Sequence, residues 1–275
     1  MAKTLQGHSR TVTCIDISMD IKPVASGSTD STVRIWDLNT GELMAGPFEC
    51  HLYFNFIAYF PNGKQIISGS DDKSVRRWDL QAGKEIEEAR VVCEKEVFAV
   101  AVSRDGRWVV TGGGNFMGLW GLKPTGTVKT LQGHLGTITC LDISMDNTLV
   151  ASGSTDSTPR IWDLNTGKLV AGPLETHTQH ITGLALSFDC ALLASASSDR
   201  TIKLWAFESR QLLASFNVQH DHSLILSPDS RQLAYATSEQ NLHIHICDIP
   251  PEILASIWPP PSVCIHPQVP GVVMH

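Results

Sequence analysis

The most constraining feature of this sequence is a tryptophan that returns at a nearly constant interval. Five tryptophans stand about 42 residues apart, and they are Trp36, Trp78, Trp120, Trp162 and Trp205. One further step falls on Cys247, which precedes an aspartate as several of the tryptophans do. A fixed period of this length indicates structural repeats that bury their apolar faces against one another. The 275 residues are therefore expected to form one domain of six stacked units.

Each unit is predicted to contain four short strands. In the first unit, apolar and polar residues alternate over residues 12–18, 24–28, 32–37 and 42–47, with turns rich in Gly, Asp, Asn and Ser between them. No stretch shows helical periodicity. Four strands per unit, repeated six times, predict an all-β radial array of small antiparallel sheets, which is a β-propeller of four-stranded blades.

Three short motifs keep the same register in several units. A GlyHis pair precedes the first strand, SerGlySer closes the second, and TrpAsp closes the third; examples are Gly7-His8 and Gly133-His134, Ser26-Gly27-Ser28 and Ser152-Gly153-Ser154, and Trp36-Asp37, Trp78-Asp79 and Trp162-Asp163. With these motifs the chain resembles the WD-repeat β-propeller family over about residues 3–258. In character it is most similar to the propeller part of fungal NTPase-linked WD-repeat proteins.

This resemblance implies a buried polar network of His, Ser, Asp and Trp within each blade. The positions that match it are His8, Ser26, Asp30 and Trp36; Ser68, Asp72 and Trp78; His134, Ser152, Asp156 and Trp162; and His177, Ser195, Asp199 and Trp205. In such a network the carboxylate accepts from the imidazole, and the hydroxyl joins the imidazole to the indole N–H. No buried polar group is then left without a partner.

Units two, three and six depart from the pattern. The departures are His51 one residue out of register in unit two; Cys93 for His, Thr111 for Ser and residues 112–115 for the Asp turn in unit three; and Thr237, Asn241 and Cys247 in unit six, where His220 or His222 takes the His position. Units three and six are therefore expected to be the least rigid.

The sequence leaves the closure of the ring open. The repeats cover about residues 1–48, 49–90, 91–126, 127–174, 175–216 and 217–258, and residues 259–275 form a Pro-rich tail. Residues 3–6 match the outer strand at residues 129–132, but residues 252–258 are equally placed to be the outer strand of the last blade. We favour six blades, with seven as an alternative if the tail completes an irregular last sheet.

Composition limits the classes of partner and compartment. The net charge of -7 disfavours a nucleic-acid or anionic membrane partner, and Lys73, Arg76 and Arg77 are interpreted as a solvated strand edge. The seven cysteines show no CxxC pair, which indicates free thiols in a reducing compartment. With neither a signal core nor an apolar run of membrane-spanning length, we expect a soluble intracellular protein, either cytoplasmic or nuclear, and we favour the cytoplasm.

Residues of catalytic type are present, but their pattern favours structure. The trio His8, Asp30 and Ser26 has the composition of a hydrolase triad, yet it recurs in other units, whereas an active site is normally unique. No GxSxG, phosphate-loop or HExxH motif occurs. The sequence therefore predicts no catalytic residue and no cofactor.

Two further groups contain residue types that bind metal ions. One group is His220 and His222, and the other is His243, His245 and Cys247, which alternate along one strand and so point to the same face. Their spacing permits a zinc site but is not diagnostic of one. We interpret them instead as residues of a degenerate strand. Asp16 and Asp142 lie in innermost strands, where they could line the central channel, and are interpreted as residues that bond neighbouring backbone N–H groups or channel water. We assign no metal ligands.

An internal duplication singles out the variable positions. Residues 3–48 and 129–174 align without gaps and are mostly identical, so that a block of three blades has been copied. The differences include Ser9-Arg10 against Leu135-Gly136, Val33 against Pro159, and residues 21–23 against 147–149. The first of these lies in the loop after GlyHis, on the face where this family usually docks partners.

The family pattern implies a partner-binding face made of the residues one and three after the His and the one before the turn Asp. These are Ser9, Thr11, Thr29, Tyr53, Asp71, Glu96, Leu135, Thr137, Thr155, Thr178, His180, Ser198 and Gln240. Tyr53, Leu135 and His180 are the favoured contacts, since aromatic and apolar anchors contribute most binding energy.

The predicted function is a non-enzymatic scaffold that binds a protein or peptide through these loops. One alternative is the sensor propeller of a larger NTPase-type receptor, although no NTPase segment is recognisable here. The alternative from another class is a metal-dependent hydrolase using the His and Cys residues of unit six. The sequence does not indicate the oligomeric state.

Overall fold

The chain folds into antiparallel sheets that follow one another along the sequence. A computed structural model describes residues 5–18, 23–49, 54–91, 95–121, 128–174, 177–218, 223–227, 229–237 and 243–257. The first three sheets contain β1 (Val12–Ile17), β2 (Pro23–Ser28), β3 (Thr32–Asp37) and β4 (Leu43–Glu49); β5 (Phe54–Tyr59), β6 (Gln65–Ser70), β7 (Ser74–Asp79) and β8 (Lys84–Val91); and β9 (Ala99–Val102), β10 (Trp108–Gly113), β11 (Phe116–Gly121) and β12 (Val128–Gln132). The other three contain β13 (Ile138–Ile143), β14 (Leu149–Ser154), β15 (Pro159–Asp163) and β16 (Leu169–Ala171); β17 (Ile181–Leu186), β18 (Leu192–Ser197), β19 (Thr201–Ala206) and β20 (Gln211–Asn217); and β21 (Ser223–Leu226), β22 (Gln232–Thr237) and β23 (His243–Asp248).

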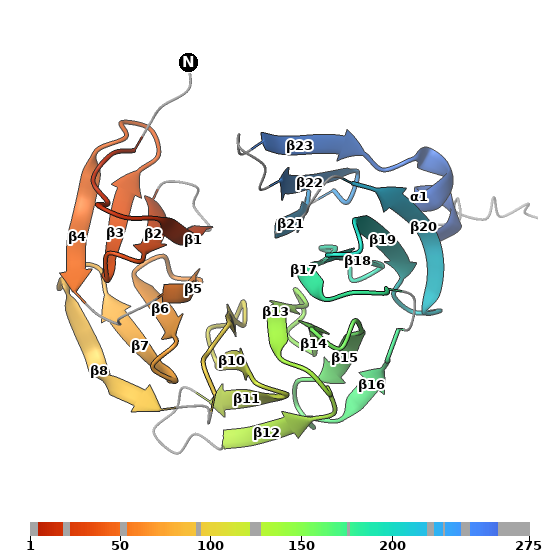
Figure 1. Ribbon diagram of the computed structural model, residues 1–275, viewed down its shortest axis with the longest axis horizontal. Coiled ribbons are helices and arrows are strands. Elements are labelled where there is room, and N and C mark those ends of the chain that lie inside the picture. Colours follow the sequence, from red (N-terminus) through yellow and green to blue (C-terminus); the bar gives the residue numbers. More distant parts are fainter. Residues whose placement is uncertain are drawn as a thin grey trace, which may run out of the picture.

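The six sheets are the blades of a propeller, numbered one to six along the chain. Figure 1 shows them around a common axis, with the first strand of each blade nearest the axis and the last farthest out. Blades one to five have four strands paired in chain order, as predicted. The blades form an open arc, because β1 of blade one and β21 of blade six do not meet (Figure 1).

Blade six differs from the prediction. Its sheet has three strands in the described residues. One of the two candidate outer strands, at residues 252–258, is wrong, because helix α1 (Pro251–Ile257) stands there. Pro251 suits the first helical position, where no backbone N–H is needed. Ile253, Leu254 and Ile257 recur at helical spacing and pack on the core shared by blades five and six.

The other candidate for the closing strand, at residues 3–6, is not supported by the residues of this segment that the structure describes. Leu5 and Gln6 belong to no strand, and residues 1–4 lie outside the described residues, as do residues 258–275 of the predicted tail. The described residues therefore contain no strand that closes the arc onto blade one.

The GlyHis motif has a steric explanation. A Cβ atom on Gly133 would lie 2.8 Å from Cη2 of Trp162, and one on Gly7 would lie 2.9 Å from Cη2 of Trp36. The indole therefore covers the backbone just before the first strand of its own blade, and only glycine leaves room for it.

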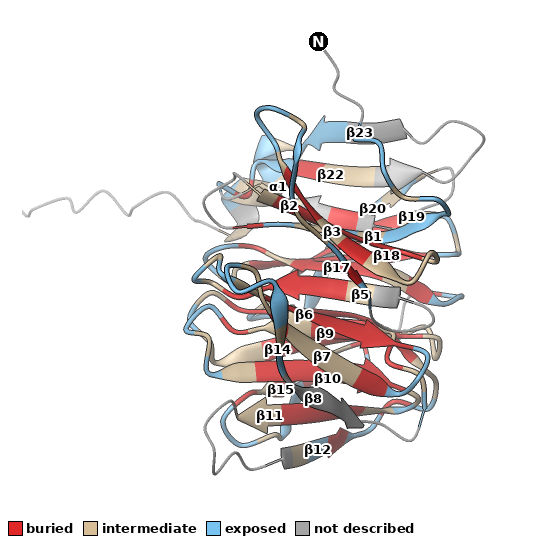
Figure 2. Ribbon diagram, turned by 90° about the vertical axis from the view of Figure 1, so that its left-hand side faces the viewer, coloured by how far each residue is buried: buried red, intermediate tan, exposed pale blue. Residues whose placement is uncertain are grey.

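The core lies between neighbouring blades, and the repeated tryptophan of each of blades two to five packs at the joint with the preceding blade. Trp162 of blade four packs in one cluster with Met117, Leu119 and Leu131 of blade three. Trp78 stacks on Phe48 of the preceding blade, with ring centroids 5.7 Å apart. In Figure 2 the buried residues follow the strands, whereas the exposed ones gather in the loops at the two faces of the ring.

The first strands of the duplicated blades show how strongly burial depends on a neighbour. On β13, Ile138, Leu141 and Ile143 are 0%, 8% and 5% exposed because they pack on blade three. Their counterparts on β1, Val12, Ile15 and Ile17, are 46%, 65% and 47% exposed. We call these three residues the leading face of blade one. Nearly identical strands thus have opposite environments.

This contrast yields a matched pair of substitutions. Ile143→Ala removes side-chain contacts with blade three and should lower the free energy of unfolding by about 2–4 kcal/mol. Ile17→Ala makes the same change at the equivalent exposed position and should cost less than about 1 kcal/mol. Denaturant unfolding of both variants checks this. Equal losses would mean that the leading face of blade one is covered in solution.

Candidate functional site

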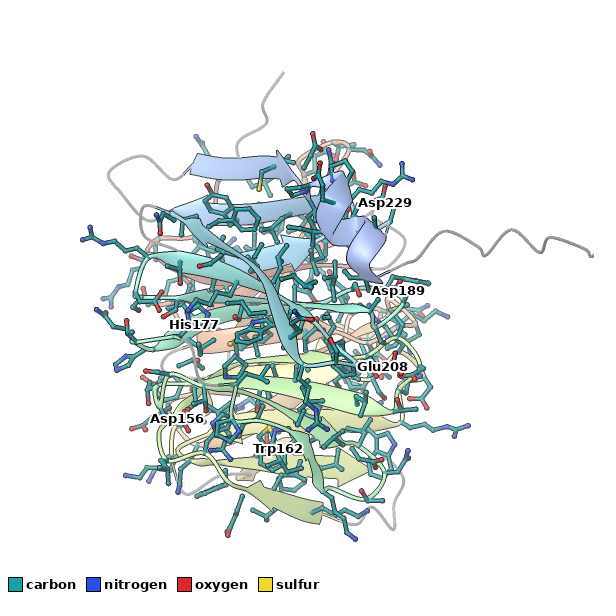
Figure 3. The ribbon with its side chains drawn as sticks, turned by 90° about the vertical axis from the view of Figure 1, so that its right-hand side faces the viewer. Asp156, Trp162, His177, Asp189, Glu208 and Asp229 are labelled. Atoms are coloured by element: carbon teal, nitrogen blue, oxygen red, sulfur yellow. The ribbon has the colours of Figure 1, made fainter. Side chains whose placement is uncertain are left out.

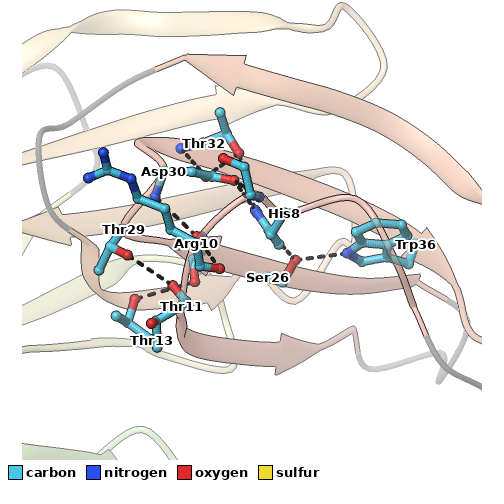
Figure 4. Close-up of polar contacts among 12 residues, drawn as sticks. His8, Arg10, Thr11, Thr13, Ser26, Thr29, Asp30, Thr32 and Trp36 are labelled. Atoms are coloured by element: carbon cyan, nitrogen blue, oxygen red, sulfur yellow. Dashed lines mark hydrogen bonds and ion pairs between the residues drawn. The ribbon is translucent and has the colours of Figure 1, made fainter.

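A chain of hydrogen bonds runs through blade one from its centre to its edge (Figure 4). The indole N–H of Trp36 donates to Oγ of Ser26 over 2.8 Å. Ser26 Oγ lies 2.8 Å from Nε2 of His8, and Nδ1 of the same ring lies 3.0 Å from Oδ2 of Asp30. With the Nδ1 proton donated to the carboxylate, Nε2 accepts the hydroxyl proton, and each group has a partner.

The same geometry recurs in blades four and five. In blade four the distances from indole to hydroxyl, hydroxyl to imidazole and imidazole to carboxylate are all 2.8 Å, and they join Trp162, Ser152, His134 and Asp156. In blade five the corresponding distances are 3.0, 2.8 and 2.9 Å, and they join Trp205, Ser195, His177 and Asp199.

Blades two and three carry shorter versions of the network. Trp78 donates to Ser68 Oγ over 3.3 Å, and Trp120 donates to Thr111 Oγ1 over 3.0 Å. In blade two, Asp72 accepts from the backbone N–H and the hydroxyl of Ser74, which shapes the turn between β6 and β7. His51 and Cys93 lie outside the described residues.

The Ser, His and Asp distances match a hydrolytic triad, but the environment does not. Ser26, Ser152 and Ser195 are at most 5% exposed, and each hydroxyl oxygen already accepts a hydrogen bond from an indole. A nucleophilic oxygen must be open to the carbonyl carbon that it attacks. These three trios can hold a blade together, but they present no accessible nucleophile.

The carboxylates of the network are held in their charged form. Burial alone raises the pKa of Asp199, but hydrogen bonds from Thr201, the backbone N–H of Thr178 and His177 outweigh it and bring the pKa to about 2. The pKa values of Asp30 and Asp156 are lowered by the same kinds of contact, which again outweigh burial. Burial lowers the pKa of His177, despite the opposing effect of Asp199.

Blade six has a different register from the one expected. Leu233 pairs with Cys247 and Tyr235 pairs with His245, so that Tyr235, and not Thr237, stands where the other blades carry the network Ser or Thr. Residues 238–242 separate β22 from β23, whereas residues 29–31 separate β2 from β3, so the count is shifted by two residues. Asn241, His220 and His222 lie outside the described residues.

The candidate zinc ligands of blade six are only partly described. His243, His245 and Cys247 occupy alternate positions on β23, but the side chains of the two histidines lie outside what the structure describes. Among the described side chains, no group of three or more His, Cys, Asp and Glu is placed to hold a metal ion.

The two aspartates of the inner strands join successive blades. Oδ2 of Asp16 accepts from the backbone N–H of Tyr59 over 2.7 Å, and Oδ2 of Asp142 accepts from that of Leu186 over 2.8 Å. Burial raises the pKa of Asp142 to about 6, although these N–H groups favour the charged form. Each carboxylate also accepts from the next residue of its own strand, Ile17 or Ile143.

The loops before the first strand and the turns between the second and third strands lie on one side of the ring. Figure 3 shows Asp156 and His177 toward this side, whereas Asp189, Glu208 and Asp229 lie toward the other. Backbone bonds join the two kinds of loop: Thr29 N–H donates to Thr11, Thr155 to Thr137 and Ser198 to His180. We call this side the docking face.

The residues predicted for the docking face differ in exposure. Those that are exposed are Ser9, Thr11, Asp71, Leu135, Thr178, His180 and Ser198. Those that are half-buried are Thr29, Glu96, Thr137 and Thr155. Tyr53 and Gln240 lie outside the described residues.

Leu135 is the apolar residue that stands out on this face. Its side chain is 89% exposed, although its own backbone N–H is fixed by a 2.9 Å bond to Oδ2 of Asp156. In blade one, the N–H of Ser9 makes the same bond to Asp30. The network therefore anchors both loops identically, and the copied blades differ in the side chain that is displayed.

Sequence reasoning missed a repeated turn on the opposite face. A serine hydroxyl donates to the aspartate two residues later in blades three to six, and the pairs are Ser103 and Asp105, Ser144 and Asp146, Ser187 and Asp189, and Ser227 and Asp229. The Ser-x-Asp spacing between the first two strands of these units was the available signal. These pairs shape turns and do not converge on one site.

Asp156 provides a test of the network. Asp156→Ala removes the acceptor for His134, Thr158 and the Leu135 N–H, and should cost at least about 2 kcal/mol of unfolding free energy. Thr155→Ala, its neighbour in the same turn, removes one acceptor for the Thr137 N–H and should cost about 0.5–1 kcal/mol. Similar melting temperatures for the two variants would show that Asp156 is not part of a buried network.

The lowered carboxyl pKa values predict sensitivity to acid. An unfolded aspartate has a pKa near about 3.9, so the stabilisation from Asp199 is complete above that value and is lost as the pH falls toward about 2. Asp199→Asn should therefore lose less stability than wild type between about pH 5 and pH 3. Melting temperatures of the wild type and of Asp199→Asn across that pH range measure this difference. Superimposable pH profiles would contradict the lowered pKa of Asp199.

Comparison with known proteins places the chain in a family. The sequence matches the WD40 family, described as WD domain, G-beta repeat, over residues 1–37, 44–79, 90–120, 125–163 and 168–206. It is 29% identical over 169 residues to cilia- and flagella-associated protein 52 of Chlamydomonas reinhardtii, covering 61% of this chain and 27% of that protein. It is 27% identical over 166 residues to protein groucho of Drosophila melanogaster, covering 60% of this chain and 22% of that protein.

Both relatives are much longer than the segment they share with this chain. The chain spans only about a quarter of the length of either protein. Within its described residues, no helix is long and apolar enough to cross a membrane. Members of the WD40 family generally act as protein-interaction scaffolds and not as enzymes. The matched repeats, the blade order and the recurring Trp, Ser, His and Asp network together make this chain a member of the WD-repeat β-propeller family.

Proposed function

We propose that this chain is a non-enzymatic recognition module that binds a protein or peptide partner through its docking face. The observation that carries the proposal is Leu135, a large apolar side chain that is 89% exposed on a loop whose backbone is held in place by Asp156. An apolar side chain on a fixed loop loses little conformational freedom when a partner covers it.

The exposed residues on the docking face of the next blade are also compatible with an interface. Thr178, His180 and Ser198 of the next blade are exposed polar residues, which suit the rim of a contact. An apolar anchor surrounded by polar residues is a common arrangement in protein interfaces, where a few side chains supply most of the binding energy. The acidic net charge of -7 disfavours nucleic acid as the partner.

Two alternatives have weaker support. The sensor propeller of a larger NTPase-type receptor would use the same docking face. This alternative therefore differs from our proposal in the protein that carries the propeller, and not in the binding site. A metal-dependent hydrolase of blade six would need ligands from His243 and His245, whose side chains are not described, and the buried Ser, His and Asp trios offer it no nucleophile. The free thiols of Cys14, Cys140 and Cys190 are compatible with our proposal of a cytoplasmic protein.

Leu135→Ala tests the proposal against a matched control. Leu135 and Leu169 are both exposed leucines of blade four, but Leu169 lies on the outer strand β16, away from the docking face. Both alanine variants should keep the wild-type melting temperature. Leu135→Ala should weaken capture of a partner from native cell lysate by about tenfold, equivalent to about 1.4 kcal/mol, whereas Leu169→Ala should not.

The measurement is quantitative mass spectrometry of proteins retained by the immobilised wild type and both variants. Tyr53→Ala, at a predicted position outside the described residues, should weaken the same capture. A partner lost equally with both leucine variants, or retained by Leu135→Ala, would overturn the assignment of the docking face.

A further inference from the structure

A cavity lies in the joint between blades five and six. Its volume is about 230 Å³, and it is partly open to solvent. Blade five contributes the outer strand β20 and the start of β19, whereas blade six contributes β22 and β23. The lining residues that matter here are Ile202, Phe216 and Val218 on one side and Leu233, Tyr235 and Cys247 on the other.

The cavity occurs at the joint whose tryptophan is missing. Cys247 pairs with Leu233 in the sheet, just as Trp205 pairs with Leu193 and Trp162 with Val150. Cys247 therefore occupies the backbone position that carries an indole in each of the five other blades. Its side chain is far smaller, and the space in front of it is not filled by another described residue.

The neighbouring joint shows what normally fills this space. Trp205 of blade five packs on Ile161, Ala171 and Leu174 of blade four and is 3% exposed. At the next joint the preceding blade offers Ile202, Phe216 and Val218 around the cavity. The surface of blade five can thus pack against a flat apolar group, although blade six has only the thiol of Cys247 at the position of the indole.

The walls have the chemistry of an aromatic site. Ile202, Phe216, Val218 and Leu233 are apolar, and Asn217 and Asp248 add polar groups to the lining. An apolar cavity of roughly 150 Å³ is large enough to stay dry and bind benzene. The present cavity is larger, and its partial opening gives a ligand access without unfolding the joint.

The chain's own helix does not occupy this space. Ile253, Leu254 and Ile257 of α1 pack on the core that blades five and six share, but none of them lines the cavity. The helix therefore closes the outside of the joint and leaves the position of the absent indole open.

We propose that the cavity between blades five and six binds one planar aromatic group of indole size, which takes the place of the tryptophan that blade six lacks. The group is either a free aromatic molecule or an aromatic side chain of a partner, since both present the same apolar ring. This site is separate from the docking face and does not depend on Leu135.

The first test uses the wild-type chain of 275 residues and indole as the probe. Cys247 Sγ belongs to the lining, so a bound ring should shield it from an alkylating reagent. Peptide mapping by mass spectrometry gives the labelling rate of Cys247, which should fall roughly tenfold when indole is present at about ten times its Kd. Labelling of Cys190, which does not line the cavity, should not change. An unchanged rate at Cys247 up to the solubility limit of indole would overturn the proposal.

The second test fills the cavity. If indole binds in the cavity, it should raise the melting temperature of the wild type. Cys247→Trp supplies the missing ring, so it should itself raise the melting temperature and should abolish the further rise that indole causes. Cys247→Ser keeps the space open and should retain the response to indole, which separates the cavity from thiol chemistry. Val218→Phe fills the cavity from blade five and serves if Cys247→Trp does not fold. A response to indole that persists in a folded filled variant would contradict the site.

The remaining arms identify the source of the ring. N-acetyltryptophanamide should protect Cys247 at lower concentration than indole if the natural occupant is a partner's side chain, and at higher concentration if it is a free molecule. Trp258→Ala tests the residue that follows α1. Protection by indole that appears only in this variant would show that the chain fills its own cavity, and would overturn binding of an external group.

Discussion

The structure depends on one side chain that has two roles at once. In each of the first five blades, the indole N–H of the repeated tryptophan closes a polar chain inside its own sheet. In blades two to five, the same ring also packs on the preceding blade. Hydrogen bonding within a blade and apolar packing between blades are therefore coupled through a single residue. A change that tilts the indole weakens both, which is how short sheets that cannot fold alone become one cooperative array.

Blade six shows the result of removing that residue. Cys247 replaces the indole, Tyr235 replaces its hydrogen-bonding partner, and the outer strand gives way to α1. The apolar surface of blade five remains, so that a cavity of about 230 Å³ appears at this joint. These departures therefore occur together at the one joint of the described blades that lacks its indole.

The sequence predicted what local pattern controls, and it failed where neighbours decide. The spacing of the tryptophans gave the number of blades, and alternation gave strands close to those of blades one to five. Two additional residues between β22 and β23 place Tyr235 at the network position, which counting back from Cys247 did not reveal. Leu135 was noticed because it differs between the copied blades, but its exposure had to come from the structure. The sequence could not predict that β1 is exposed and β13 is buried, because the two strands are nearly identical and their burial depends on whether another blade packs against them.

The leading face of blade one has a consequence for assembly at high concentration. Val12, Ile15 and Ile17 are the near copies of residues that fit against blade three in blade four, so blade three has two candidate neighbours of almost the same shape. During folding, blade one of one molecule can compete with blade four of another for that surface. Exchange of equivalent blades between chains is a characteristic failure of repeat proteins. The duplication that makes this propeller simple to build also makes its blades interchangeable.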